Sequence, residues 1–113
     1  CTIYDRNVGQ MMEDSEAWKL CIACGLEAFT AGRAKGVSFS FDDPVDYITR
    51  YSEKLLESRP SMLLDHYAKR RSEIDFINGM VPVVAGEVGT RAPYNEVMST
   101  LIRSREAGFG DAP

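Results

Sequence analysis

The sequence has few cysteines and no long hydrophobic run, and each scarcity excludes a class of protein. Three Cys residues among 113 are an odd number at low density, which argues against a disulfide framework and favours a reducing compartment. No stretch approaches the roughly 18 consecutive apolar residues of a membrane span. The first 20 residues carry four acidic side chains, which is not typical of a signal peptide. We therefore expect a cytoplasmic protein with no membrane partner.

Basic residues are also scarce, with 13 Lys and Arg against 17 Asp and Glu and a formal net charge of −4. A nucleic-acid binder needs a surplus of positive charge to neutralise phosphates, so we expect no nucleic-acid partner. The length suits a single domain, and 44% hydrophobic with 27% charged residues is typical of a globular protein. A start at Cys1 instead of Met suggests a portion excised from a longer protein.

Apolar residues recur at helical spacing almost throughout, which predicts an all-α fold of five or six helices. A short turn is expected over residues 8–13. A long helix should begin after Asp14 and end at Gly36, because glycine adopts a positive φ without a steric penalty. The segment 37–41 alternates weakly, but it is short and has no partner strand, so we interpret it as a connector.

Proline marks the limits of the helices in the middle of the chain. Asp42-Asp43-Pro44 predicts a helix start, because proline at the first helical position loses no hydrogen bond. Pro60 is expected to end that helix, and Ser61 to begin another. Each of these two segments carries apolar residues at intervals of three and four.

The second half of the chain is predicted to form two longer helices. Ser72 should cap the first, which carries an apolar stripe, ends at Gly89 and kinks at Pro82 because proline removes one helical hydrogen bond. The stripe consists of Ile74, Ile77, Val81, Val84 and Val88. Ala92-Pro93 should open the last helix, which runs to about Ala107, and the tail beyond it is expected to be loose.

Cys21 and Cys24 form a C-x-x-C pair in the middle of the long predicted helix. A zinc site needs about four ligands, and only Cys1 and His66 remain as further candidates. A redox C-x-x-C usually lies at a helix N-terminus, where the thiolate is stabilised. Two small buried thiols explain the pair better, and we expect no metal site.

Three polar features of the second half are candidates for function. His66 has no obvious nucleophile beside it, so it is interpreted as a helix-surface or partly buried residue. The run Lys69-Arg70-Arg71 could bind an anion, but a solvated helix junction is the simpler interpretation. Glu73 falls beside the apolar stripe, at a first helical turn that favours a carboxylate. Its pattern leaves a functional acid and a merely electrostatic one equally open.

No glycine-rich phosphate loop is present. The sequence contains neither G-x-G-x-x-G nor G-x-x-x-x-G-K-[ST]. If a nucleotide binds, this chain does not supply the usual loop for it.

Two linked segments resemble the C-terminal domain of the ketopantoate reductase (2-dehydropantoate 2-reductase) family. Arg59-Pro60-Ser61-Met62-Leu63-Leu64-Asp65 is similar to its P-S-M-x-x-D motif. Arg70-Arg71-Ser72-Glu73-Ile74-Asp75-Phe76-Ile77-Asn78-Gly79 is similar to its T/S-E-I-D-x-I-N-G motif. Gly89 with Pro93-Tyr94-Asn95 fits the family's G-x-x-x-P-x-N turn, and Val8-Gly9-Gln10-Met11 fits its upstream segment.

The resemblance spans most of residues 8–107 and implies both a fold and an activity. The implied fold is an all-α domain like the C-terminal part of 6-phosphogluconate dehydrogenase, with residues 1–113 forming one domain on the substrate side. An N-terminal Rossmann domain that binds NADPH, absent from this chain, is the implied partner, and a homo-oligomer is possible. The implied reaction is the reduction of ketopantoate, a small 2-oxo acid, to pantoate in pantothenate biosynthesis.

The resemblance also assigns residues. Ser61 matches the family serine that binds the substrate. Glu73 matches an active-site glutamate with an orienting role in catalysis, associated with positioning of the cofactor and of the catalytic lysine. Asp75 and Asn78 match motif positions that we interpret as structural.

Two departures from the family pattern limit what this chain can do. The catalytic lysine lies in a K-x-x-x-N segment that would precede Cys1, and none of Lys19, Lys35, Lys54 and Lys69 matches it. The isolated chain is therefore expected to be inactive. Val8 stands where some relatives carry a substrate-contacting Asn. Alternatives thus stay open: a reductase of the same layout acting on another small 2-oxo acid, or a non-catalytic helical interaction module.

Overall fold

The computed structural model describes residues 1–109, and this part of the chain is helical with no strand, which confirms the predicted all-α class. The described residues form six α-helices and one 3-10 turn. These are α1 (Val8–Glu13), α2 (Ser15–Ala34), α3 (Pro44–Glu53), α4 (Ser61–Tyr67), η1 (Ile74–Phe76), α5 (Met80–Glu87) and α6 (Pro93–Ala107). Residues 110–113, part of the tail expected to be loose, lie outside the described residues.

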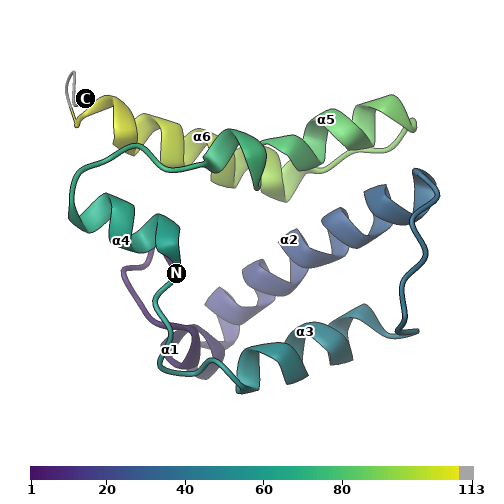
Figure 1. Ribbon diagram of the computed structural model, residues 1–113, viewed down its shortest axis with the longest axis horizontal. Helices are drawn as coiled ribbons and strands as arrows, with labels where there is room; N and C mark the ends of the chain where they lie inside the picture. The colour runs from purple at the N-terminus through teal and green to yellow at the C-terminus, as the bar shows by residue number, and fades with distance from the viewer. Residues whose placement is uncertain (110–113) are drawn as a thin grey trace.

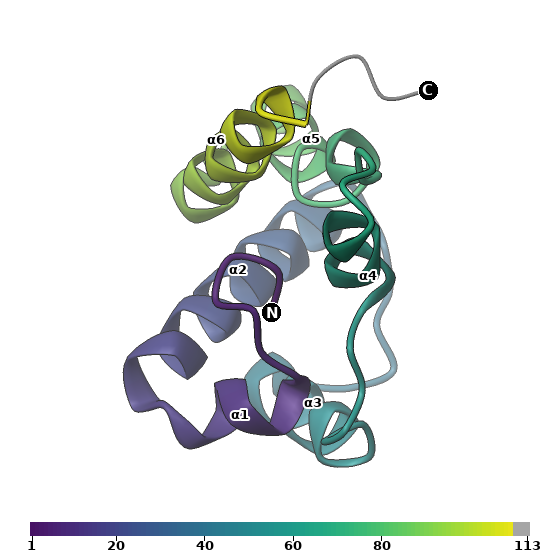
Figure 2. The same ribbon diagram turned by 90° about the vertical axis from the view of Figure 1, so that its left-hand side faces the viewer.

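The helices are stacked in three tiers with α2 in the middle (Figure 1). α5 and α6 lie above α2, α1 and α3 lie below it, and α2 packs against all four. α4 stands at the side of the molecule, beside the space between the tiers, as the turned view shows (Figure 2). None of the helices formed by residues 1–109 is both long and apolar enough to cross a membrane.

Side-chain caps begin α2 and α3 as the sequence predicted. The carboxylate of Asp14 accepts hydrogen bonds from the amides of Glu16 and Ala17, at 3.1 and 3.2 Å. Asp43 accepts in the same way from the first turn of α3, where Pro44 is the first helical residue. Gly36 follows the end of α2 with a φ of 97°. Each start or stop depends on residues close in sequence, which is why the pattern alone located it.

Two expectations in the first half of the chain are wrong. Residues 8–13 form helix α1 and not a simple turn, because Asn7 and Gln10 make a capping box at its start. α3 ends at Glu53, well before Pro60. The carbonyl of Leu56 accepts a 2.7 Å hydrogen bond from the amide of Gly9. The backbone after α3 therefore caps α1 and does not continue its own helix.

The helix predicted from Ser72 to Gly89 with a kink at Pro82 is also wrong, because it is broken into η1 and α5. Ile77, with φ −109° and ψ −98°, interrupts it before α5 begins. Pro82 then lies in the first turn of α5, where an amide has no helical partner to lose, so no kink is needed. Gly89 follows α5 with a φ of 77°, and α6 runs from Pro93 to Ala107 as predicted.

One cluster of core residues lies where α2 meets the tier above it, and further buried apolar residues are Met11, Ala17, Leu63, Ile74 and Ile102. Ala31, Ala85 and Ala92 are buried in that cluster, with Val81 and Val84 packed against them. Small side chains let the helices approach closely but bury little apolar area. Many large apolar side chains consequently stay exposed, including those of Phe76, Ile77, Met80, Val83 and Val97.

Candidate functional site

The motif segment 72–79 is fastened to α6 along its length. Three of its polar side chains bond to three residues spaced along that helix: Ser72 to Glu106 at 2.5 Å, Asp75 to Arg103 at 2.7 Å, and Asn78 to Asn95 at 2.8 Å. Asp75 and Asn78 thus both contact α6, and their interpretation as structural residues stays a prediction.

Glu73 is the other acidic residue of this segment, and its carboxylate is exposed. It is exposed and precedes η1, but its side chain makes no cap hydrogen bond there. It also takes part in none of the ion pairs formed within residues 1–109. Because the neighbouring motif residues are held by α6, the backbone that carries Glu73 is fixed while its carboxylate faces solvent.

Ser61, the other predicted site residue, is the first residue of α4 and is exposed. Within the described residues it makes no hydrogen bond to Glu73, so the structure does not join the two side chains directly. They are connected through the far end of α4, where His66 is buried with a side-chain exposure of only 4%. His66 is therefore an interior residue and lies deeper than we expected.

A cluster of the buried residues His66 and Glu106 with the half-buried Ser72, here called the Glu106 cluster, makes this connection. The Oε2 atom of Glu106 lies 2.9 Å from Nε2 of His66, and it accepts from the Ser72 amide and hydroxyl at 2.6 and 2.5 Å. Burial alone would raise the pKa of Glu106, but the hydrogen bonds from Ser72 and His66 outweigh it and lower the pKa. An ionised carboxylate can only accept, so His66 donates from Nε2. Phe109 packs edge-on against the His66 ring, with centroids 5.0 Å apart.

Sequence reasoning missed Glu106, although its position carried a signal. The buried residues of α6 are Asn95, Ser99, Ile102 and Glu106, which follow one another at helical intervals. A glutamate on the buried stripe of a helix requires polar partners, because an unpaired buried charge is costly. The stripe therefore indicated a buried polar contact but could not name His66 and Ser72 as the partners.

A second polar network, also missed, anchors the start of α6. The carboxylate of Glu27 in α2 accepts from the amides of Tyr94 and Asn95, at 2.8 and 2.9 Å, so Glu27 caps α6 from a neighbouring helix. The Asn95 side chain donates both to Glu27 and to the carbonyl of Cys24. The same side chain accepts from Asn78, so this network orders the end of the motif segment.

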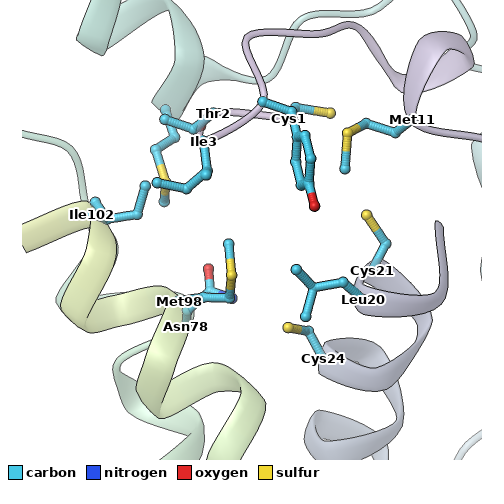
Figure 3. Close-up of a pocket in the computed structure, with 12 residues that line it drawn as sticks. Cys1, Thr2, Ile3, Met11, Leu20, Cys21, Cys24, Asn78, Met98 and Ile102 are labelled. Atoms are coloured by element: carbon cyan, nitrogen blue, oxygen red, sulfur yellow. The ribbon is translucent and has the colours of Figure 1, made fainter. Parts of the chain in front are cut away.

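An apolar cavity lies between the N-terminal residues, α2 and α6 (Figure 3). It has a volume of about 240 Å³ and is rich in sulfur. Its lining consists of Cys1, Thr2, Ile3, Tyr4, Met11, Leu20, Cys21, Cys24, Met62, Asn78, Met98 and Ile102. Met62 belongs to the first motif and Asn78 to the second, so both motifs contribute to its wall even though Ser61 and Glu73 do not.

Cys21 and Cys24 are half-buried and face this cavity, so they are less enclosed than the two buried thiols that we expected (Figure 3). Burial, and then the charge of Glu27, raises the pKa of Cys24 to about 11. Burial also raises the pKa of Cys21. Both side chains are neutral thiols at neutral pH. Among residues 1–109, no three His, Cys, Asp or Glu side chains are grouped to hold a metal ion.

The basic run Lys69-Arg70-Arg71 follows α4 and is exposed along its length. Arg70 makes a 3.2 Å ion pair with Asp65, and Lys69 adopts a φ of 55° in the turn. An exposed cationic turn that pairs with its own helix agrees with the interpretation of a solvated helix junction.

The fold and these contacts define a class of protein, namely an all-helical domain in which α4 and the motif segment 72–79 are both hydrogen-bonded to α6. Residues 1–106 match the family model described as ketopantoate reductase PanE/ApbA C terminal. The chain belongs to this family, which confirms the resemblance seen in its motifs.

Curated relatives agree with this assignment. The 2-dehydropantoate 2-reductase of Streptococcus pyogenes serotype M3 is 29% identical over 108 residues, which cover 95% of this chain and 35% of that protein. The 2-dehydropantoate 2-reductase of Archaeoglobus fulgidus is 27% identical over 101 residues, covering 89% of this chain and 33% of that protein. The chain thus spans about a third of the length of the curated relatives that it matches.

Solved structures share the fold. A PanE/ApbA family ketopantoate reductase from Ralstonia eutropha JMP134 superposes with a TM-score of 0.85 and 27% identity, over 96% of this chain and 36% of that one. A dimeric ketopantoate reductase from Staphylococcus aureus superposes at 0.83 with 24% identity, over 96% and 38% of the two chains. A D-mandelate dehydrogenase superposes at 0.82 with 23% identity, over 96% and 46%. The last two likenesses concern the fold alone.

Proposed function

We propose that this chain is the substrate-side domain of an NADPH-dependent 2-dehydropantoate 2-reductase, a cytoplasmic enzyme that reduces ketopantoate to pantoate for pantothenate synthesis. The observation that carries the proposal is the exposure of the Glu73 side chain on a backbone that its neighbours hold in place. Its motif neighbours Ser72, Asp75 and Asn78 are bonded to α6, whereas Glu73 is exposed on a fixed backbone. A carboxylate held in this way suits an active site that closes against a second domain.

NADPH supplies the hydride when it is bound, but residues 1–109 do not fit the dinucleotide itself, because they contain no phosphate-cradling loop. The proposed holder of NADPH is a Rossmann domain preceding residue 1. On this chain, Ser61 donates a hydrogen bond to a polar group of the substrate. Glu73 orients the lysine of the preceding segment and the polar groups on the nicotinamide side. Such orientation contributes several kcal/mol of barrier lowering once the domains enclose the substrate.

The test compares residues 1–113 alone with the longer protein that includes the proposed Rossmann domain. Each is mixed with NADPH and ketopantoate, and NADPH absorbance is followed. We expect turnover only with the longer protein, because the proton donor and the dinucleotide site lie outside this chain. Turnover by residues 1–113 alone, or no turnover by the longer protein with any small 2-oxo acid, would contradict the proposal.

Val8 favours a second candidate, a reductase of the same layout that acts on another small 2-oxo acid. Val8 begins α1 and has no polar side-chain atom, so it cannot make the contact that an Asn would make at this position. A substrate screen on the longer protein distinguishes the two candidates. If ketopantoate is the substrate, it should have the highest kcat/KM of the acids tested. If another acid is preferred, Val8→Asn should shift preference toward ketopantoate.

The proposed partners are the Rossmann domain and a second copy of the protein. The exposed apolar side chains of Phe76, Ile77, Met80 and Val83 follow one another from η1 into α5, and the first two belong to the motif that carries Glu73. Exposed apolar side chains that cluster in this way mark interaction surfaces. A non-catalytic interaction module would use the same surface without the reaction, so the turnover assay separates it from the enzyme. Sedimentation of the longer protein at several concentrations determines the oligomeric state.

A further inference from the structure

All the hydrogen bonds within the Glu106 cluster are made to one oxygen atom of Glu106. Its Oε2 atom faces three donor groups, namely Nε2 of His66 and the amide and hydroxyl of Ser72. Glu106 is 5% exposed, so these hydrogen bonds form away from bulk water. Hydrogen bonds to a charged acceptor are about twice as strong as neutral ones, and more so in a dry interior.

The donors come from the two segments that carry the proposed site. His66 is in α4, the helix that Ser61 begins, and Ser72 directly precedes Glu73. Besides these donors, Asp75 pairs with Arg103 and Asn78 bonds to Asn95, but both of these ties start from the segment 72–79 and neither involves α4. The ion pair between Asp75 and Arg103 has both side chains at least half exposed, and such pairs contribute little. The carboxylate of Glu106 is thus the buried point at which both segments meet α6.

We propose that Glu106 is a positioning residue for the reaction, which sets the placement of Ser61 and Glu73 relative to each other without touching the substrate. This inference rests on the proposed function. Replacing Glu106 with Ala removes the acceptor and leaves the buried donor of His66 and the half-buried donors of Ser72 without their partner. α4 and the turn before η1 then lose their common anchor, and the two site residues move independently.

The experiment is a double-mutant cycle in the longer protein, with Glu106→Ala and Glu73→Gln made singly and together. Glu106→Ala should lower kcat/KM for the 2-oxo acid by about tenfold in the wild type but by no more than about twofold beside Glu73→Gln. The dissociation constant of NADPH, measured without the 2-oxo acid, should stay within about twofold of wild type. A merely structural loss of folded protein would lower activity equally in both backgrounds.

Milder variants keep the test decisive if Glu106→Ala does not fold. Glu106→Gln retains one acceptor oxygen, and Ser72→Ala removes only the hydroxyl donor, so each should lower kcat/KM by about threefold, less than Glu106→Ala. The matched control is Glu96→Gln, which changes an exposed acid on the same helix and should leave kcat/KM unchanged. Amide hydrogen exchange over residues 61–79 should be faster in Glu106→Gln and unchanged in Glu96→Gln.

The outcomes separate this inference from the proposed function. Additive effects in the cycle, or unchanged exchange over residues 61–79 in Glu106→Gln, would overturn the inference even if the enzyme is fully active. A longer protein that reduces no 2-oxo acid would overturn the proposed function. Faster exchange in Glu106→Gln would then still support Glu106 as the anchor of the two segments.

Discussion

The side-chain amide of Asn78 donates a 2.8 Å hydrogen bond to the side-chain carbonyl of Asn95, which joins the last polar residue of one motif to the start of α6. Asn95 is 2% exposed, and its own amide group donates to Glu27 and to the carbonyl of Cys24. One buried asparagine therefore connects α2, α6 and the motif segment, and this connection determines how the segment meets the helices.

Replacing Asn95 should destabilise the domain strongly. Asn95→Ala removes three hydrogen bonds made by a buried side chain to half-buried partners, so the free energy of unfolding should fall by about 2–4 kcal/mol. Asn78→Ala breaks only one of these bonds at a half-buried site and should cost about 1 kcal/mol. Urea denaturation followed by circular dichroism measures both. A loss below about 0.5 kcal/mol for Asn95→Ala would show that the network does not stabilise the fold.

Two glycines should respond in opposite directions to the same substitution. A Cβ added to Gly79 would lie 3.0 Å from the carbonyl oxygen of Ile74 and 3.0 Å from Cα of Asp75, both of them backbone atoms. Gly79→Ala should therefore destabilise by about 1–3 kcal/mol. A Cβ on Gly86, inside α5, meets nothing within 4 Å, and Gly86→Ala should stabilise by about 0.5–1 kcal/mol. Thermal unfolding of both variants tests the pair, and equal shifts would contradict it.

The stability of the domain should depend on pH through Glu106. Its pKa is lowered in the folded state from the ordinary value of 4.5, so the folded state favours the ionised form. This contribution is complete above the unfolded pKa and is lost as the pH falls through the folded pKa. The difference in unfolding free energy between wild type and Glu106→Gln should be constant above about pH 6 and shrink steadily below 4.5.

The control for this titration is Glu87→Gln, which removes an exposed acid that pairs with Lys35. Exposed pairs contribute about 0–1 kcal/mol, so its effect should be small at every pH. A gap between wild type and Glu106→Gln that widens on acidification would contradict the assignment of the lowered pKa to the Glu106 cluster.

The two proposed site residues should affect different kinetic constants. In the longer protein, Ser61→Ala should raise the KM for the 2-oxo acid by about tenfold, because one hydrogen bond to the bound substrate is lost. Glu73→Ala should lower kcat by about tenfold or more, because the lysine and the nicotinamide side lose their orientation. Steady-state kinetics separates the two effects.

Matched controls for these kinetics are Ser104→Ala and Glu96→Ala, which alter exposed residues of the same types on α6. Both should leave kcat and KM unchanged. Normal constants for Ser61→Ala and Glu73→Ala would remove these residues from the site.

Much of the fold could be predicted because the features that start and stop these helices are local. Asp14 and Asp43 each cap a helix through amides within one turn of themselves, Pro93 is the first residue of α6, and Gly36 and Gly89 follow helix ends with positive φ. Helical spacing of apolar residues then identified the class. These signals need no knowledge of what lies across the core.

The errors arose where a distant partner outweighs the local pattern. The apolar stripe from Ile74 to Val88 suggests one helix, but bonds from the segment 72–79 to α6 hold it in a different path. The end of α3 was placed too late because the carbonyl of Leu56 bonds to Gly9, which is far away in sequence. Neither contact has a local signature, so spacing alone could not reveal it.

The sequence by itself determined the helical class, the family and the two residues proposed to act, Ser61 and Glu73, because motifs and caps are short-range features. Only the tertiary structure showed which residue holds them together. Glu106 lies 34 positions from Ser72 and 40 from His66 along the chain, and they meet because α4 and the motif segment fold back onto α6. A buried carboxylate requires partners, and the folded chain decides which donors can reach it.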